Sequence, residues 1–341
     1  MKKLILVIGA GFSGATAARM LADRGHFVHL IDRDSHIGGA AYDFKTPDGL
    51  LVGSHGAHIF HTNMDHVWNF VTQFSHFEPV KHTVYSYNDQ LGYIHFPPSE
   101  KLVNLLGEEK IRDLFYRSYS EKMWGISFDE LPNSIKNRKP IGAKDLFYFH
   151  DKYEGVPKDG YTRLLENMLD HQNIIVDLNT EAELSMIDDF DFCFSSCSID
   201  TMFGYKHGSF RYRGIQYLNY NQPIHVNLNV PVINYSNDSG GTIRSVNWRH
   251  FYYNDPDKFS DHIINERPFE AGVNSYERHY PLPWLRKKYL QSYKNDLEYY
   301  QDKLKFIGRL GQYAYLDMDE AISSSMKSVK DYLYYENSKA T

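Results

Sequence analysis

The chain begins with an apolar strand, a glycine-rich turn and a helical pattern, and this combination limits its fold more than any other feature. The run Leu4–Ile8 has the continuous apolar pattern of a parallel strand that is buried on both faces. The motif Gly9-x-Gly11-x-x-Gly14 follows at once, and helical spacing continues to a stop at Gly25. In such a motif the first glycine permits a tight turn, the second lets a pyrophosphate approach the backbone, and the third lets the helix pack on the strand. The free N–H groups at the start of the helix favour the phosphate.

A second strand strengthens this interpretation. The segment HFVHLID ends in Asp32, eighteen residues after Gly14, where an acidic side chain can hold ribose hydroxyls. Together these features predict a Rossmann-like dinucleotide-binding domain, and the alternative is a tight turn that binds nothing. Arg33 and the pair Gly38-Gly39 come just after the acidic residue, which is similar to the extended signature of two-dinucleotide-binding flavoproteins. The sequence therefore favours FAD over NAD.

Composition and charge exclude several classes of protein. With 42% hydrophobic and 23% charged residues, the chain is too apolar for disorder. Its 37 Lys and Arg against 43 Asp and Glu show no long basic stripe, so we expect no nucleic-acid partner. No apolar stretch reaches the roughly 18 residues of a membrane-spanning helix, so we expect no membrane partner. Cys193 and Cys197 have no second ligand pair nearby, and we expect a reduced, cytoplasmic protein.

Five segments occur in the order, and at close to the spacing, found in bacterial UDP-galactopyranose mutases. They are HIGGAAY, HGAHIFHT, SYSEKMWG, YEGVPKDGYTRLLENML and GRLGQYAYLDMDEAISS. The chain resembles this family over residues 3 to about 328, with a looser match from about 205 to 300. The resemblance implies an α/β fold in which residues 1–80, 150–204 and 300–341 form a discontinuous FAD-binding domain. A small helical insertion at 97–149 carries a mobile lid, and residues 205–295 form an antiparallel β-sheet substrate domain.

The resemblance also implies the reaction. In this family, N5 of reduced FAD attacks the anomeric carbon of UDP-galactopyranose and expels the nucleoside diphosphate, and the sugar recloses as UDP-galactofuranose. No Ser-His-Asp elbow, pair of catalytic carboxylates or metal cluster accompanies the dinucleotide motif, so the cofactor must carry the difficult step. The alternatives are the same chemistry on another nucleotide sugar such as UDP-arabinopyranose, a flavin oxidoreductase of this fold, and a binder without catalytic activity.

The cofactor contacts implied by the resemblance lie in four places. They are the glycine-rich turn, the segment after Asp32, the loop that contains His55, His58 and His61 (the histidine loop), and the C-terminal motif GRLGQYAYLDMDEAISS. The predicted cofactor-binding residues are Gly9, Gly11, Phe12, Ser13, Gly14, Asp32, Arg33, Gly38, Gly39, Ala40, His58, Ile59, Arg244, Arg309, Asp317 and Met318.

The histidine loop has an alternative role as a metal site. His55, His58 and His61 at spacing three could bind zinc, but no carboxylate lies closer in sequence than Asp65, and we predict no metal. The resemblance instead places the backbone near Gly56 at the reactive edge of the flavin.

The substrate contacts combine arginines with aromatic side chains. Arg138 follows Trp124 by fourteen residues, the spacing at which the family places a lid arginine on the diphosphate. Tyr119 and Trp124 can stack on a nucleobase, although Trp124 could equally be a core anchor. The predicted catalytic residues are Arg138, Arg309 and His58, and the predicted substrate-binding residues are Tyr119, Trp124, Arg138, Tyr148, Arg267, Tyr280, Tyr315 and Asp317.

Some positions depart from the family pattern. Arg267 lies two positions from where the motif expects an arginine, and His82 stands where the family usually has asparagine. Asp317 has the alternative role of a helix N-cap. A Gly240-Gly241 turn predicts a hairpin that ends in the cofactor residue Arg244. Because the departures surround the sugar and phosphate region, they bear on the sugar more than on the reaction class. A homodimer is a candidate assembly for a chain with 27 tyrosines and 21 phenylalanines.

Overall fold

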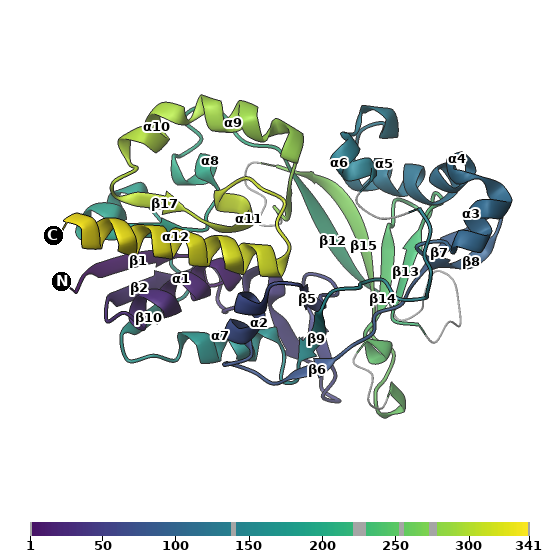
Figure 1. Cartoon of the computed structure of the whole chain (residues 1–341), viewed down its shortest axis with the longest axis horizontal. Helices are drawn as coiled ribbons and strands as arrows, with labels where there is room; N and C mark the ends of the chain where they lie inside the picture. Colours follow the sequence, from purple (N-terminus) through teal and green to yellow (C-terminus); the bar gives the residue numbers. More distant parts are fainter. Residues whose placement is uncertain (1, 138–140, 221–229, 252–255, 273–277, 340–341) are drawn as a thin grey trace.

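The computed structural model contains two large sheets and a helical insertion, arranged side by side along the long axis of the molecule (Figure 1). It describes residues 2–137, 141–220, 230–251, 256–272 and 278–339. Both termini lie at the end of the five-stranded sheet, and the insertion lies at the opposite end of the molecule.

The five-stranded sheet is parallel, with strand order β10-β2-β1-β11-β17. Its strands are β1 Leu4–Ile8, β2 Phe27–Ile31, β10 Ile174–Asp177, β11 Phe192–Ser195 and β17 Leu304–Phe306. The two strands predicted around the glycine-rich turn are confirmed and pair directly with each other.

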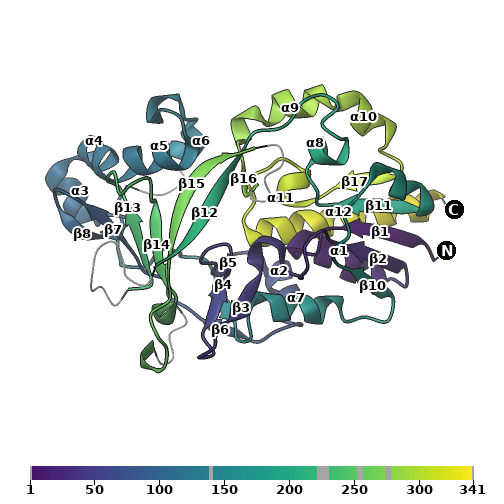
Figure 2. The same cartoon turned by 180° about the vertical axis from the view of Figure 1, so that it is seen from behind.

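Successive side chains of β1 are apolar and point to opposite faces of the sheet, which explains why helices cover both faces. Ile5 and Val7 point to a core formed with α1, α7 and α12, while Leu6 and Ile8 point to a second core on the other face. Figure 2 shows the second face, which α8, α9 and α10 cover. These helices are α1 Phe12–Ala22, α7 Tyr161–Leu169, α8 Ile199–Met202, α9 Arg286–Ser292, α10 Lys294–Tyr299 and α12 Met318–Lys339.

The seven-stranded sheet has the order β16-β12-β15-β14-β13-β7-β8, and its neighbouring strands are antiparallel except for β13 and β7. Its strands are β7 Val84–Asn88, β8 Gly92–Phe96, β12 Tyr212–Tyr220, β13 Val232–Tyr235, β14 Arg244–Asn247, β15 Ile263–Ala271 and β16 Tyr280–Pro281. The predicted hairpin around Gly240 is confirmed, because β13 and β14 pair on either side of it.

The helical insertion packs on this sheet through Ile215 and Ile243. Its elements are α3 Glu100–Leu106, α4 Glu108–Ile111, a π-helical segment Arg112–Arg117, α5 Ser118–Trp124, a 3-10 segment Phe128–Glu130 and α6 Asn133–Lys136.

Short elements connect the larger parts. The remaining strands are β3 Asp43–Lys45 with β4 Leu51–Gly53, and β5 Phe60–Thr62, β9 Tyr153–Pro157 and β6 Phe77–Pro79 in a three-stranded sheet. The remaining helices are α2 Asp65–Val71, α11 Gly308–Gly311 and the 3-10 segments Gly39–Ala41, Leu184–Asp189, Trp248–His250, Pro256–Lys258 and Pro283–Leu285.

Two details differ from the boundaries expected from the sequence. Strands β7 and β8 join the seven-stranded sheet, although the sequence placed only residues 205–295 in it. Helices α9 and α10 pack instead against the five-stranded sheet, where Tyr289, Tyr293 and Leu297 enter its second core. Within the described ranges, no helix is both long and apolar enough to cross a lipid bilayer.

Candidate active site

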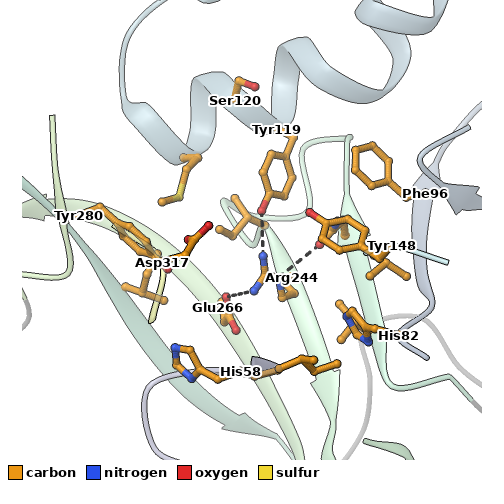
Figure 3. Close-up of a pocket in the computed structure, with 18 of the residues that line it drawn as sticks. His58, His82, Phe96, Tyr119, Ser120, Tyr148, Arg244, Glu266, Tyr280 and Asp317 are labelled. Carbon is orange, nitrogen blue, oxygen red and sulfur yellow. Dashed lines mark hydrogen bonds and ion pairs between the residues drawn. The ribbon is translucent and has the colours of Figure 1, made fainter. Parts of the chain in front are cut away.

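A cavity of about 430 Å³ lies where the seven-stranded sheet, the insertion and the start of α12 meet (Figure 3). Segments that are far apart in sequence supply its walls, as expected for a cleft between lobes. The predicted residues that line it are His58, Ile59, His82, Tyr119, Trp124, Tyr148, Arg244, Tyr280, Arg309, Tyr315, Asp317 and Met318.

Arg309 on α11 has a fixed guanidinium group. Its Nε and Nη2 donate to the carbonyl oxygen of Leu316 at 2.9 and 2.6 Å, and Nη1 donates to the carbonyl of His279 at 3.4 Å. Its Cζ lies 5.2 Å from the ring centroid of Tyr280 and 5.5 Å from that of Tyr315. Neutral carbonyls and aromatic faces thus orient a full positive charge at the cavity, which suits an anionic diphosphate.

Aromatic rings form the wall beside Arg309. Tyr280 and Tyr315 stack with centroids 5.6 Å apart, and Trp124 lies 6.1 Å from Tyr315. Burial raises the pKa of Tyr280, so its hydroxyl stays protonated and can donate a hydrogen bond. Trp124 also packs against Trp284 at 5.5 Å and is only 6% exposed, so it is a core anchor that faces the cavity.

Arg244 lies on the floor of the cavity, where three elements hold its guanidinium (Figure 3). Nε donates to Oδ1 of Asn234 on β13 at 3.3 Å, and Nη2 donates to the hydroxyl of Tyr119 on α5 at 3.4 Å. Nη1 lies 3.5 Å from Oε2 of Glu266, the residue directly opposite on β15. Burial raises the pKa of Glu266, and the guanidinium opposes that rise. Glu266 therefore supplies the carboxyl group that faces Arg244 within the floor.

The histidine loop brings neutral imidazoles to the cavity. Burial, Arg309 and His55 lower the pKa of His58 to about 4. Burial, His55 and Arg309 lower the pKa of His279 to about 3. His55 packs edge-on against Tyr217 and His279, with centroids 5.8 and 5.3 Å apart. At neutral pH, His58 can accept or donate a hydrogen bond but adds no positive charge.

The loop itself lies directly on Glu266. Gly56 has a φ of +90°, and a Cβ at this position would lie 2.9 Å from Oε1 of Glu266. The hydroxyl of Tyr161 donates to the carbonyl of His58 at 3.1 Å and the hydroxyl of Tyr217 donates to that of His55 at 2.9 Å. The backbone of the loop is thus fastened at both ends.

The glycine-rich turn has the shape of a pyrophosphate cradle. A Cβ on Gly14 would lie 1.8 Å from the carbonyl oxygen of Gly9, so the helix packs on the turn only with glycine here. A Cβ on Gly11 would lie 3.7 Å from the carbonyl oxygen of Gly38, so the two glycine segments face each other across a narrow gap. The carboxylate of Asp32 accepts from the amide of Ala10 at 2.6 Å and braces the turn. These features fit the phosphates of a dinucleotide.

Other predicted cofactor residues surround this turn in different ways. Phe12 is buried against Phe60 and Tyr161. Oγ of Ser13 lies so near Gly308 that a Cβ added to that glycine would come within 2.4 Å of it. Arg33 and Ala40 are exposed beside the turn, and Gly39 adopts a φ of +53°.

Asp317 precedes α12 and occupies its N-cap position. Its backbone N–H donates to Oε2 of Glu320 at 2.9 Å, which is one half of a capping box. The carboxylate of Asp317 lines the cavity, together with Met318 in the first turn. The N-cap role and the site role therefore coexist.

Two of the predicted substrate-binding residues, Arg267 and Arg138, are not placed at the cavity. Arg267 lies on β15 next to Glu266, and because side chains alternate along a strand it points to the other face, toward the Gly240-Gly241 turn. This placement gives no support to a substrate role for Arg267. Arg138 lies outside the described residues, so its role stays a prediction.

Sequence reasoning missed Glu266 and Asn234, which face the cavity. The period of two in β15 was a usable signal, since only one of positions 266 and 267 can face the substrate.

The remaining candidates for metal or disulfide chemistry have other contacts. His61 Nδ1 lies 2.6 Å from Oδ2 of Asp151, and His55 Nδ1 lies 2.8 Å from Oγ of Ser54. Over the part of the chain that the structure describes, no three His, Cys, Asp or Glu side chains converge as a metal site. Both cysteines are free thiols.

Comparisons with known proteins match the chain to two family models and to curated relatives over nearly its full length. The family model for UDP-galactopyranose mutase matches residues 114–315, and that for an NAD(P)-binding Rossmann-like domain matches residues 7–74. A probable UDP-galactopyranose mutase of Klebsiella pneumoniae is 30% identical over 97% of this chain and 95% of its own length. A dTDP-fucopyranose mutase of Escherichia coli is 30% identical over 98% of this chain and 99% of its own.

The fold agrees with these relatives. A solved structure of reduced UDP-galactopyranose mutase superimposes with a TM-score of 0.73 and 14% identity, covering 98% of this chain and 96% of the other. At that identity the likeness concerns the fold, which is a Rossmann-like α/β domain combined with a second sheet and helices.

Proposed function

The chain belongs to the UDP-galactopyranose mutase family, whose members are isomerases, and we propose that it interconverts UDP-galactopyranose and UDP-galactofuranose with reduced FAD as cofactor. The observation that most supports this activity is the oriented Arg309, which faces the same cavity as the histidine loop and the aromatic wall. Such a cavity suits a substrate that is anionic at the diphosphate and neutral at the sugar.

The chain's own residues fit FAD as the dinucleotide. The backbone of the glycine-rich turn would hold the pyrophosphate, Asp32 the ribose, and the start of α12 at Asp317 the flavin end. When bound, reduced FAD supplies the nucleophile for the anomeric carbon.

The protein then has to keep the leaving group in place. A nucleoside diphosphate that diffused away could not recombine with the sugar, so Arg309 and the hydroxyls of Tyr280 and Tyr315 would hold it. By its place in the family pattern, Arg138 would add a second positive charge when the insertion closes. Tyr148, whose ring lies edge-on to His82 at 5.8 Å, would contact the same region from the opposite wall.

A second candidate is the same chemistry on a different nucleotide sugar. The relative from Escherichia coli that matches nearly the full chain is a dTDP-fucopyranose mutase, and fucose carries a methyl group where galactose has a hydroxymethyl. Apolar side chains also line part of the cavity, namely Val84, Phe96, Phe149, Val232 and Phe251. UDP-arabinopyranose, which lacks the hydroxymethyl, is a further candidate. The division into domains, a homodimer and a cytoplasmic location stay predictions from the sequence.

The test is direct. FAD-loaded protein, reduced with dithionite, is incubated with UDP-galactofuranose, UDP-arabinofuranose or dTDP-fucofuranose, and the products are separated by chromatography. We expect conversion to the pyranose without net consumption of reductant, and no conversion by oxidised protein. If no sugar isomerises while the flavin stays bound and reduced, the proposed activity is wrong. If only the deoxysugar or the pentose reacts, the mutase chemistry stands and galactose is the wrong sugar.

A further inference from the structure

We propose that Lys122 is a positioning residue of this site, an inference that rests on the proposed function: its ammonium group fixes α5 on the hairpin of β13 and β14, so that Tyr119 meets Arg244. Tyr119 and Arg244 line the cavity, whereas Lys122 lies behind them and acts only through them. Neither the sequence pattern nor the comparisons assign a role to Lys122.

The ammonium group of Lys122 lies where three backbone carbonyl groups of the hairpin converge. Nζ donates to the carbonyl oxygens of Tyr235 at 2.9 Å, Asn237 at 2.5 Å and Thr242 at 2.9 Å. These bonds use all three N–H donors of the group, and the positive charge makes each of them stronger than a bond between neutral partners. Because the carbonyls belong to the end of β13, the turn and the approach to β14, the three contacts together fix where α5 lies on the hairpin.

The charge of Lys122 is held partly away from water. Its side chain is half-buried, and burial lowers its pKa to about 8, while Asp238 in the same hairpin opposes that change. The ammonium group therefore keeps its charge at neutral pH. A lysine in the last turn of a helix commonly bonds the final carbonyls of its own helix, but here the donors go to a different element. Capping of α5 thus does not account for this placement.

A second cation fastens the same end of α5 in the opposite direction. Nε and Nη2 of Arg213, which is buried on β12, donate to the carbonyl oxygens of Met123 at 2.7 Å and Lys122 at 3.0 Å. Gly125 ends the helix with a φ of +68°, and a Cβ there would lie 2.8 Å from Nη1 of Arg213. One cation reaches from the helix to the sheet and the other from the sheet to the helix. The last turn of α5 is therefore joined to the seven-stranded sheet from both sides.

This attachment lies about one helical turn from the contact that it positions. Tyr119 precedes Lys122 by three residues, so both side chains lie on the same face of α5. On the hairpin, Arg244 follows Thr242 by two residues. Figure 3 shows Tyr119 pointing from α5 toward Arg244, and its hydroxyl lies 3.4 Å from Nη2. Because a hydrogen bond of this length is near the limit of the interaction, a small shift of α5 would break it.

The experiment is a double-mutant cycle that combines Lys122→Met with Tyr119→Phe in FAD-loaded protein. Methionine keeps an unbranched side chain but offers no donor to the three carbonyls. Lys110→Met on α4 is the matched control, because Lys110 is exposed and does not line the cavity. Calorimetry measures the affinity for UDP, and steady-state kinetics with UDP-galactofuranose give KM and kcat. Amide hydrogen exchange of the same proteins without nucleotide measures how readily α5 opens.

We expect Lys122→Met to raise the dissociation constant of UDP and KM by roughly 3- to 10-fold, with kcat changed by less than about twofold. Adding Tyr119→Phe to Lys122→Met should cost less than about twofold more, because the hydroxyl no longer meets Arg244 once α5 has shifted. Exchange should become faster in α5 and the hairpin but not in the five-stranded sheet. Tyr119→Phe should keep its full effect in the Lys110→Met background. If Lys122→Met does not fold, Lys122→Gln retains two N–H donors and should show the same coupling.

Two results would overturn the role of Lys122. One is a double variant whose loss equals the product of the two single losses. The other is a fall in kcat and flavin content with KM unchanged, which would mean general destabilisation. If the unaltered protein binds UDP but isomerises no sugar, the proposed function is wrong, and the cycle in UDP affinity still decides the role of Lys122. If it does not bind UDP, the same cycle in exchange rates decides it: Tyr119→Phe should speed exchange in α5 only while Lys122 is present.

Discussion

The hydroxyl of Tyr119 lies 3.4 Å from Nη2 of Arg244, so a hydrogen bond joins the helical insertion to the floor of the cavity. Tyr119 belongs to α5, and Arg244 begins β14 of the seven-stranded sheet. The other nitrogens of the same guanidinium are held by the sheet itself, through Asn234 and Glu266. A shift of α5 relative to the sheet therefore acts directly on a group that lines the site.

Replacing Tyr119 by Phe should test this link. The variant keeps the ring but loses the hydroxyl, and since the bond is long we expect roughly a 3- to 10-fold loss in kcat/KM, mainly through KM, with flavin content unchanged. Tyr299→Phe is the matched control, because its ring is 80% exposed outside the cavity. Steady-state kinetics that match the unaltered protein would show that the contact has no functional role.

Removing the guanidinium of Arg309 should have a larger effect. Arg309→Ala deletes an oriented charge from a site where a diphosphate leaves and returns, and we expect turnover to fall at least ~100-fold while flavin absorbance stays. Arg309→Lys should recover only part of the turnover. A lysine ammonium lacks the planar, forked donors with which the guanidinium can bind the Leu316 carbonyl and a phosphate at the same time. Arg163→Ala, on an exposed side chain of α7, is the control.

We expect Arg138→Ala to lower turnover by a comparable factor. This expectation rests on the sequence pattern alone. Near-normal turnover in both arginine variants would remove the assigned diphosphate roles.

The local parts of this architecture were predictable, and the non-local parts were not. Apolar runs, glycine spacing and Asp32 identified the strands around the phosphate turn, because each of these signals acts over a few neighbouring residues. The parallel pairing of β13 with β7 joins residues about 150 positions apart, and no local pattern contains it. Glu266 was missed for a related reason, since a strand predicts alternation but only the fold decides which face meets the substrate.

His279 should make the stability of the protein sensitive to acid. Burial, His55 and Arg309 lower its pKa to about 3, whereas an imidazole in the unfolded chain titrates near 6.5. Below pH 6.5 the unfolded chain binds a proton that the native state refuses, so stability is present above that pH and is lost as the pH falls toward 3. For this residue alone, the loss between pH 7 and pH 5 amounts to about 2 kcal/mol.

Urea unfolding at both pH values checks this expectation. His279→Tyr should lose about 2 kcal/mol less than the unaltered protein on going from pH 7 to pH 5. His76→Tyr replaces a side chain that is 72% exposed and should leave the difference unchanged. If all three proteins lose the same stability between pH 7 and pH 5, His279 takes up its proton as readily in the native state as in the unfolded chain, and the lowered pKa is wrong.

Gly14→Ala should damage the cofactor cradle at its base. The added Cβ would lie 1.8 Å from the carbonyl oxygen of Gly9, so α1 must move away from the turn, and we expect at least about 2 kcal/mol of destabilisation together with weaker flavin binding. Gly272→Ala meets nothing within 4 Å and serves as the control. Unfolding midpoints and flavin titrations measure both effects. A Gly14→Ala protein with normal flavin affinity would show that the turn does not hold the cofactor.

His82→Asn should change which sugar the protein prefers. The imidazole of His82 is buried in the cavity wall, with its ring centroid 5.8 Å from those of Tyr148 and Phe251. Asparagine, the usual family residue, is smaller and polar, so it would leave room and a hydrogen-bonding group for a hydroxymethyl substituent. Discrimination over one such group is worth ~1–3 kcal/mol, so the ratio of kcat/KM for UDP-galactofuranose over UDP-arabinofuranose should rise about 10-fold. His95→Asn, which packs on Tyr85 at 4.0 Å outside the cavity lining, should leave the ratio unchanged. If the ratio stays constant in His82→Asn as well, this wall does not select the sugar, and the preference must arise elsewhere in the cavity.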